Sequence, residues 1–387
     1  MDFSLSQEQE MFRNYVRKFL DDAGQTKIAR EVTEGKVDSL QTLREGMAEL
    51  GCTSLNVPEE YGGMGLGSLD LVPILEEMGR ALIPSLYLET NALVVPLLEK
   101  YGTNQQKDKY LPAIAEGTHT FTLAWLEEKG SYKPSGINMR GERKGDSLVL
   151  NGVKSSVPDA RLADSLLVLV RTNEGNGHDG ITLVIVDNAE ASLQIQSQKN
   201  IDETRLLAKV HFEDISVSSE QILGDIHHGW EIIQEGLLSL NAALCANIIG
   251  SMDSIVEMAT EYANIREQFG QPIGRFQAIK HRIVDMKLDL ETGRSLTYYA
   301  NWAIESGAPD RVAAIASARL FVTEAFIRVA SHNIQIHGGI GFTEEMDCQL
   351  YVKRARFYEN YLGNKQQYYD QAAEALGWLQ KEKVVLV

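Results

Sequence analysis

The sequence contains little cysteine. Its three cysteines, Cys52, Cys245 and Cys348, form no Cys-x-x-Cys pair and no metal-ligand spacing, so we expect no metal site. A sparse, odd-numbered set fits a reducing compartment, which predicts a cytoplasmic protein. Cys245 lies in an apolar stretch and is most simply a core residue.

Positive charge is also scarce. Lysine and arginine number 37 against 54 acidic residues, giving a formal net charge of −17. Such a chain repels phosphate backbones and anionic lipid, so we expect no nucleic acid or membrane surface as partner. No uninterrupted apolar stretch reaches the length of a membrane span, and the first residues show no secretory signal. We therefore expect no membrane span.

The pattern of residues changes twice along the 387-residue chain. Apolar residues at three- and four-residue spacing predict helices in the first third, with Ser6 or Ser4 capping the first helix and Gly24 ending it. Short β-branched runs follow, and long helical periodicity returns near Gly229. This order predicts an α+β fold with segregated layers. The expected domains are a helical domain at 1–118, a β domain at 119–225, a helical bundle at 226–378 and a tail at 379–387.

The β domain is expected to be an antiparallel sheet or a small barrel. The predicted strands lie at 120–124, 147–150, 165–170, 181–186 and 210–212. The turns between them are expected at Asn151-Gly152, Gly175-Asn176-Gly177 and Asp179-Gly180.

Two long motifs carry a family resemblance. The first comprises Arg266-Glu267-Gln268-Phe269-Gly270, Pro272-Ile273, Phe276-Gln277 and Asp285-Met286, and the second runs from Gln335 to Phe342. Pro58-x-Glu60-Tyr61-Gly62-Gly63-x-Gly65 and Asn151-Gly152-x-Lys154 support them. Together they closely resemble the acyl-CoA dehydrogenase family over nearly the whole chain. The resemblance implies an N-terminal helical domain, a central β-barrel domain and a C-terminal four-helix bundle, with FAD as cofactor and an acyl-CoA thioester as substrate.

The resemblance also implies roles for single residues. Arg266 would hold the FAD pyrophosphate of a neighbouring subunit, because a guanidinium offers a planar fork of donors to phosphate oxygens. Phe269 would pack beside the adenine. Gln335, Gly338 and Gly339 would complete this ADP site. In the alternative interpretation, Arg266 pairs with an acid and Phe269 fills the core.

At the position of the flavin ring, the sequence departs from the family. The family's Thr-Glu-Pro segment is replaced here, with Ala124 and Trp125 at the positions of the threonine and the acid. The family's aromatic-Ile-Thr segment becomes Ser156-Val157-Pro158. Proline lacks both a hydroxyl and an N–H group, so a flavin-ring pocket on this chain would be short of donors.

The two family positions of the catalytic base carry hydrocarbons. Leu362 stands at the base position in the C-terminal helices, and Leu240 stands at the alternative position on an earlier helix. Neither can accept the α-proton of a thioester. Glu359 lies one helical turn before Leu362, a displacement of about 5 Å. We expect it to pair with Arg356 or Lys353 instead.

Several other residues are expected to be structural. His337 is placed near the cofactor by its motif, without a role as base. His227-His228 has no third ligand nearby in sequence, so a metal is not expected. The tyrosines at 358, 361, 368 and 369 are expected to form an interface or core stripe, and Lys353-Arg354-Ala355-Arg356 replaces the family's Arg-Asp-Ala-Arg.

These departures favour one hypothesis and leave two alternatives open. The favoured one is a subunit of a hetero-oligomer, which lends the ADP half of the FAD site to a homologous acyl-CoA dehydrogenase chain that carries the base. The second is a homo-oligomeric flavoprotein with altered, flavin monooxygenase-like chemistry. The third is a non-catalytic acyl-CoA binding protein; association with DNA, known in one branch of the family, is disfavoured by the net charge.

Overall fold

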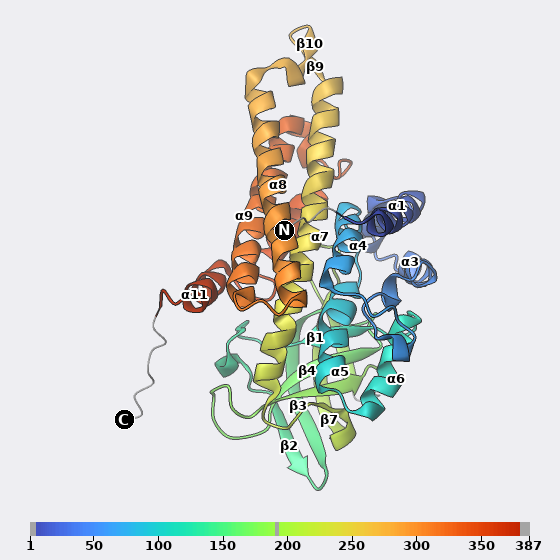
Figure 1. Cartoon of the computed structure of the whole chain (residues 1–387), viewed down its shortest axis with the longest axis vertical. Helices are drawn as coiled ribbons and strands as arrows, with labels where there is room; N and C mark the ends of the chain where they lie inside the picture. Colours follow the sequence, from blue (N-terminus) through green and yellow to red (C-terminus); the bar gives the residue numbers. More distant parts are fainter. Residues whose placement is uncertain (1–4, 190–192, 380–387) are drawn as a thin grey trace. The chain divides into compact units, whose positions relative to one another are not determined.

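The computed structural model describes residues 5–189 and 193–379 (Figure 1). The chain divides into two compact units, each built from segments distant in sequence. Unit 1 comprises Met1–Thr26, Leu71–Ile83 and Asn241–Val387, and unit 2 comprises Lys27–Asp70 and Pro84–Leu240. The domain boundaries expected from the sequence stay a prediction, and nearly all of the expected tail lies outside the described residues.

Helices and a sheet make up unit 2. Its helical elements are α2 (Thr26–Thr33), α3 (Asp38–Glu49), a π-helical turn at Leu88–Val94, α5 (Val95–Tyr101) and α6 (Asn104–Ala115). The predicted amphipathic helix before Gly51 is confirmed as α3, which buries Leu40, Leu43 and Met47.

The sheet of unit 2 has eight strands. They are β1 (Phe121–Ala124), β2 (Arg140–Lys144), β3 (Ser147–Pro158), β4 (Ser165–Arg171), β5 (Ile181–Asp187), β6 (Leu193–Gln198), β7 (Leu207–Ser218) and β8 (Ile222–Leu223). The order is β6-β7-β3-β2-β4-β5-β8, with β1 beside β4. Because β1 and β2 both run parallel to β4, the sheet is mixed and not purely antiparallel as expected. One face buries an apolar core that includes Leu150, Val168 and Val184.

The expected turn at Asn151-Gly152 is wrong. Both residues lie inside β3, where the register against β7 shifts between Leu150 and Gly152. The hairpin turn between β2 and β3 instead passes through Gly145, which has φ +64°. The local Asn-Gly pair marks a bulge because pairing with β7 continues on both sides of it.

Unit 1 is helical. It contains α1 (Gln7–Asp22), α8 (Gln277–Glu305), α9 (Arg311–His337), α10 (Cys348–Tyr358) and α11 (Lys365–Ala375), together with most of α4 (Ser68–Arg80) and of α7 (Gly229–Ile265). Ser6 caps α1 as predicted, in a capping box with Gln9. In Figure 1 the long helices α8 and α9 run side by side, and a small hairpin of β9 (Glu267–Gln268) and β10 (Gln271–Pro272) joins α7 to α8.

Two glycines allow α4 and α7 to touch backbone to backbone within unit 1. A Cβ atom at Gly79 would lie 1.8 Å from the carbonyl oxygen of Asn247, and one at Gly250 would lie 1.7 Å from that of Glu76. Any side chain at either position would force the helices apart. The close approach places the carboxylate-rich face of α4 against α7.

The apolar helix α7 is long and hydrophobic enough, by length and composition, to cross a membrane. Within its most apolar window 78% is buried inside the protein, which identifies α7 as a core helix. All three cysteines are buried and free, including Cys245 on this helix.

Candidate cofactor site and base positions

The first motif forms the exposed end of unit 1. Arg266 follows α7, is exposed, and its guanidinium has no ion pair or side-chain hydrogen bond within 5–189 and 193–379. Phe269 sits at the tip of the β9–β10 hairpin, where its φ is +54° and its side chain is 92% exposed. Its ring lies edge-on to the Phe276 ring, at 6.0 Å between centroids. The alternative reading, a paired Arg266 and a core Phe269, is therefore wrong for this unit.

The second motif ends α9. Gln335 and Gly339 are exposed, and no atom of another described residue packs within 4 Å of where a Cβ atom of Gly338 or Gly339 would be. Gly338 has φ +64°, which favours glycine. The turn thus presents bare backbone, as a close approach by a ligand requires.

His337 connects the ends of α7 and α9. Its buried ring stacks on that of Tyr262, with 4.1 Å between centroids, and its Nδ1 lies 3.0 Å from the carbonyl oxygen of Asn333. Burial lowers the pKa of His337. Because Tyr262 lies one turn before Arg266, this contact brings the two motifs to the same end of unit 1. His337 acts there as a structural residue.

The positions expected to face a flavin ring lie in unit 2. Trp125 follows β1, is 3% exposed, and packs edge-on against Tyr132 and Trp230 at 5.5 and 5.7 Å between ring centroids. Its indole Nε1 is buried and has no hydrogen-bond partner in the described part of the chain. Ala124, just before it, belongs to the core of the sheet.

Two backbone groups of this region already have partners. The N–H of Ser156, a residue with φ +52°, donates to Gln198 Oε1 at 3.0 Å. Pro158 has no N–H to give, and its carbonyl oxygen accepts from the hydroxyl of Thr122. Ala124 and Pro158 thus offer no hydroxyl to a ring, whereas the Ser156 hydroxyl and the Trp125 Nε1–H have no partner among the described residues.

A buried ion pair lies beside these positions. The Lys154 ammonium, fully buried, donates to Glu127 Oε1 at 2.8 Å and to the carbonyl oxygen of Trp125 at 3.2 Å. Burial lowers the pKa of Lys154 despite Glu127. Burial opposes ionisation of Glu127 too, but Lys154 and the N–H groups of Asn138 and Met139 outweigh it and lower the pKa of Glu127.

Both base positions are buried. Leu240 has no exposed surface, and Leu362 is 7% exposed with φ +65°, an uncommon conformation for leucine. The expected ion pair of Glu359 is confirmed: its Oε2 lies 3.0 Å from Arg356 Nη1. Glu359 is therefore engaged at the surface, in an ion pair.

A buried arginine that sequence reasoning missed holds the Leu362 turn. Arg319 on α9 donates from Nη2 to the carbonyl oxygens of Tyr358 and Tyr361, at 2.7 and 3.0 Å. Its Nε donates to Asn241 Oδ1 at 3.2 Å. Arg319 follows Ala318 in an ordinary helical pattern, so no local signal marks it.

The histidine pair and the tyrosines singled out in the sequence pack against neighbouring residues of the fold. His227 Nδ1 lies 2.8 Å from Thr172 Oγ1, and no group of three metal-ligating side chains occurs among the described residues. Of the tyrosine stripe, Tyr358, Tyr361 and Tyr368 are buried and Tyr369 is 47% exposed.

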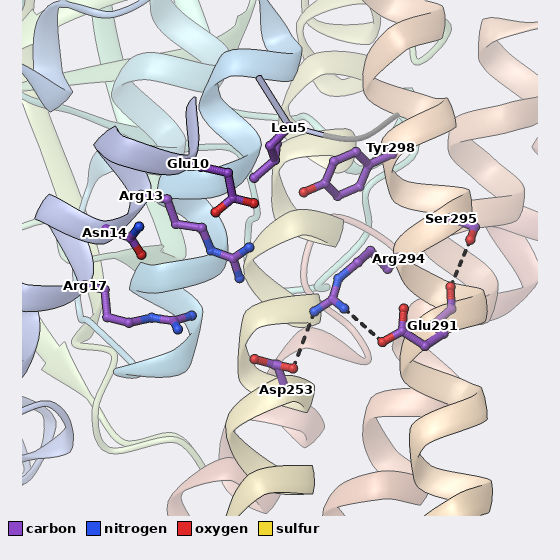
Figure 2. A pocket seen from close by; sticks show the side chains of 10 residues that line it. All are labelled: Leu5, Glu10, Arg13, Asn14, Arg17, Asp253, Glu291, Arg294, Ser295 and Tyr298. Atoms are coloured by element: carbon purple, nitrogen blue, oxygen red, sulfur yellow. Dashed lines mark hydrogen bonds and ion pairs between the residues drawn. The ribbon is translucent and has the colours of Figure 1, made fainter. Parts of the chain in front are cut away.

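A charged hollow of about 510 Å³ lies in unit 1 between α1, α7 and α8 (Figure 2). Arg13 and Arg17 of α1 bind the buried Glu77, with 2.7 Å from Arg13 Nε to Oε1. Arg13 also pairs with Glu76 at 3.1 Å, and burial raises the pKa of Glu76 despite Arg294 and Arg13. Because every arginine there has carboxylate partners, we interpret the cluster as the attachment of α1.

The chain matches three models of one family. The acyl-CoA dehydrogenase N-terminal domain matches residues 6–118, the middle domain 122–215 and the C-terminal domain 227–377. The chain belongs to the acyl-CoA dehydrogenase family. The resemblance and the fold expected from it are thereby confirmed.

Individual members of the acyl-CoA dehydrogenase family align over almost the full chain. Acryloyl-CoA reductase (NADH) of Anaerotignum propionicum is 28% identical over 375 residues, covering 95% of this chain and 93% of that protein. The structure of butyryl-CoA dehydrogenase from Megasphaera elsdenii is 26% identical, with a TM-score of 0.88, covering 97% of this chain and all of that one. A structure described as an FAD-dependent dehydrogenase is 26% identical, with a TM-score of 0.87, covering 98% and 100%. FAD is thus confirmed as the cofactor of this family.

The described residues of this family member fit one half of FAD. The unpaired Arg266, the exposed Phe269 and the open Gly338-Gly339 backbone suit an ADP group. Ala124 and Pro158 offer no hydroxyl to a flavin ring, which needs hydrogen bonds at its edge.

Proposed function

We propose that this chain is the base-lacking subunit of a hetero-oligomeric acyl-CoA dehydrogenase. It would lend the ADP half of the FAD site to a homologous partner, which carries out α,β-dehydrogenation of an acyl-CoA thioester. One observation carries the proposal: Leu362 and Leu240 are buried hydrocarbons at the base positions, while Phe269 is exposed and the exposed Arg266 has no ion pair with any described residue. The residues that would serve the chain's own site are lost, and those that would serve a neighbour are kept.

The removal of the α-proton supports assigning different roles to the two subunits. Bound FAD supplies the hydride acceptor, and the α-proton of the thioester must go to a base within hydrogen-bond reach. Leu362 offers no lone pair, and Glu359, one turn away, is paired with Arg356. A partner subunit with a glutamate at the position of Leu362 would provide the base in its own site.

The binding step supports the lending role. A guanidinium without a protein counter-ion is available to a pyrophosphate, with which it can form paired hydrogen bonds. Phe269, 92% exposed at a hairpin tip, leaves a large apolar face in water unless another molecule covers it. Both residues would reach outward to the partner's FAD. The reduced, buried cysteines fit a cytoplasmic location for the assembly.

The test is co-expression with homologous chains that carry Glu-Gly-Thr near the C-terminus and a Thr-Glu-Pro segment. A tag on this chain should co-purify one such partner together with FAD. The flavin of the mixed complex should bleach with an acyl-CoA thioester, and bleaching should be lost when the partner's glutamate is changed to glutamine. If no homologue forms a mixed complex, and this chain alone oxidises thioesters, the proposal is wrong.

A further inference from the structure

A small, enclosed hollow beside the Leu362 turn has no part in the proposed function. It measures about 160 Å³ and lies in unit 1 between α9 and α11. Its lining includes Arg319, Leu320, Glu324, Ile327, Lys365 and Tyr368. At about 30 Å³ per water, this volume holds roughly five water molecules or one small ion with its contacts.

Arg319 is the buried charge in this hollow. The residue is 1% exposed, and no carboxylate within 4.0 Å of its guanidinium occurs in the described part of the chain. Four of its five N–H groups donate to Asn241, Thr323 and the carbonyl oxygens of Tyr358 and Tyr361. The second N–H on Nη1 has no partner among residues 5–189 and 193–379. The carbonyls at the end of α10 offset the charge only in part, because a helix terminus carries about half a unit charge.

The charged groups on the rim of the hollow neutralise one another. Glu324 pairs with Lys365, and Glu359 pairs with Arg356. The lining itself holds Arg319 and Lys365 against Glu324 and Glu359; Arg356, which lies outside the lining, adds one positive charge by its pair with Glu359. A buried cation without a counter-ion is costly, and an anion that enters the hollow would remove this cost.

We infer that the hollow is a binding site for a small oxyanion, such as a carboxylate or inorganic phosphate. Arg319 binds the anion from within, and Lys365 stands at the opening. Leu320 and Ile327 form the apolar wall that limits its size. The bound anion neutralises the arginine that holds the Tyr358–Leu362 turn, so it stabilises the folded chain in proportion to its occupancy.

The test measures the melting temperature of the full-length chain against acetate or phosphate, with chloride replaced at constant ionic strength. A saturable rise with at least one of the two is expected. If the melting temperature saturates with acetate, the natural ligand carries a carboxylate. If it saturates with phosphate, the natural ligand carries a phosphate group. No saturable rise with either ion would overturn the inference.

Two variants locate the effect. Leu320→Phe fills the hollow without changing any charge and should abolish the rise, whereas Leu288→Phe, a matched change at a position 60% exposed on α8, should keep it. A rise that survives in Leu320→Phe would contradict the inference.

A third variant changes the charge at the rim. Glu324→Gln removes a negative charge there and should tighten binding roughly twofold to fivefold. Weaker binding in this variant would also contradict the inference.

Discussion

The hydroxyl of Tyr368 lies 3.1 Å from the carbonyl oxygen of Leu362 and 2.8 Å from Asn241 Oδ1. It therefore ties α11 to the turn at Leu362, beside Arg319, whose guanidinium lies 5.4 Å from the centroid of the Tyr368 ring. A single hydroxyl proton serves two buried acceptors, and Arg319 Nε supplies the second donor to Asn241. Side chains of α9 and α11 thus hold the turn.

Replacing this hydroxyl should weaken the chain measurably. Tyr368→Phe leaves a buried carbonyl without its donor, which costs about 1–2 kcal/mol of unfolding free energy. The matched control is Tyr369→Phe, next in sequence but 47% exposed, which should change stability by less than about 0.5 kcal/mol. Urea unfolding of the two variants measures the difference. Equal effects would show that the Tyr368 bond does not hold the turn.

Supplying the base alone should not restore activity. Leu362→Glu places a carboxylate at the family position, but the ring contacts at Ala124 and Pro158 remain without hydroxyls. We expect no thioester-dependent bleaching until Ala124→Thr and Pro158→Thr are added, each worth about 1 kcal/mol in flavin binding. Anaerobic visible spectra of the single and triple variants test this, with Leu362→Gln in the triple background as control. Bleaching by the single variant would show that the chain's own ring pocket is adequate.

If this chain lends the ADP half of the FAD site, substitutions there should lower the FAD content of the complex without lowering the stability of the chain. Arg266→Gln and Phe269→Ala should each lower the FAD content of the mixed complex at least tenfold, because the pyrophosphate and adenine contacts are lost. Both side chains are exposed, so unfolding free energies should stay within about 0.5 kcal/mol of the unsubstituted chain. Arg275→Gln, an exposed arginine in the same segment, serves as control. Full FAD content in the Arg266 variant would remove this residue from the cofactor site.

The buried pair in unit 2 predicts a response to acid. The pKa of Glu127 is lowered in the folded chain, so its stabilisation is complete above the unfolded value of about 4.3 and is lost as pH falls through the folded pKa. Glu127→Gln should cost about 3–5 kcal/mol near neutral pH, because it leaves the Lys154 ammonium buried without its carboxylate. The unfolding free energy of this variant should also fall less steeply as the pH is lowered.

The double variant Glu127→Gln/Lys154→Met provides the control for that prediction. Removing both charges should recover most of the lost free energy, since no unpaired charge remains. Urea midpoints measured from pH 3 to 7 test both statements. A double variant as unstable as the single one would mean that packing, and not the ion pair, sets the cost.

Local sequence signals predicted the fold best where a few neighbouring residues decide the conformation. Ser6 and Gln9 form a capping box within one turn, so the start of α1 could be read directly. Asn151-Gly152 carried an equally strong turn signal, but the ladder with β7 overrode it. Strand β2, Arg140–Lys144, was missed because its side chains are mostly exposed and charged.

In the candidate site, too, some residues could be predicted from the sequence and others could not. The exposure of Phe269 and the hydrocarbons at Leu240 and Leu362 follow from motif positions in the sequence. Arg319 and its hollow could not be foreseen, because its partners are backbone carbonyls 39 and 42 residues away. Backbone acceptors carry no side-chain signature, so only three-dimensional packing reveals them.

The most direct test of the account is the visible absorption spectrum of the purified chain alone, before and after an acyl-CoA thioester is added without oxygen. We predict little or no bound flavin, because Ala124 and Pro158 offer the ring no hydroxyl and the base positions carry Leu240 and Leu362. Adding the base-carrying partner should restore a flavin spectrum that the thioester bleaches. Tightly bound flavin that bleaches in the chain alone would contradict the central claim.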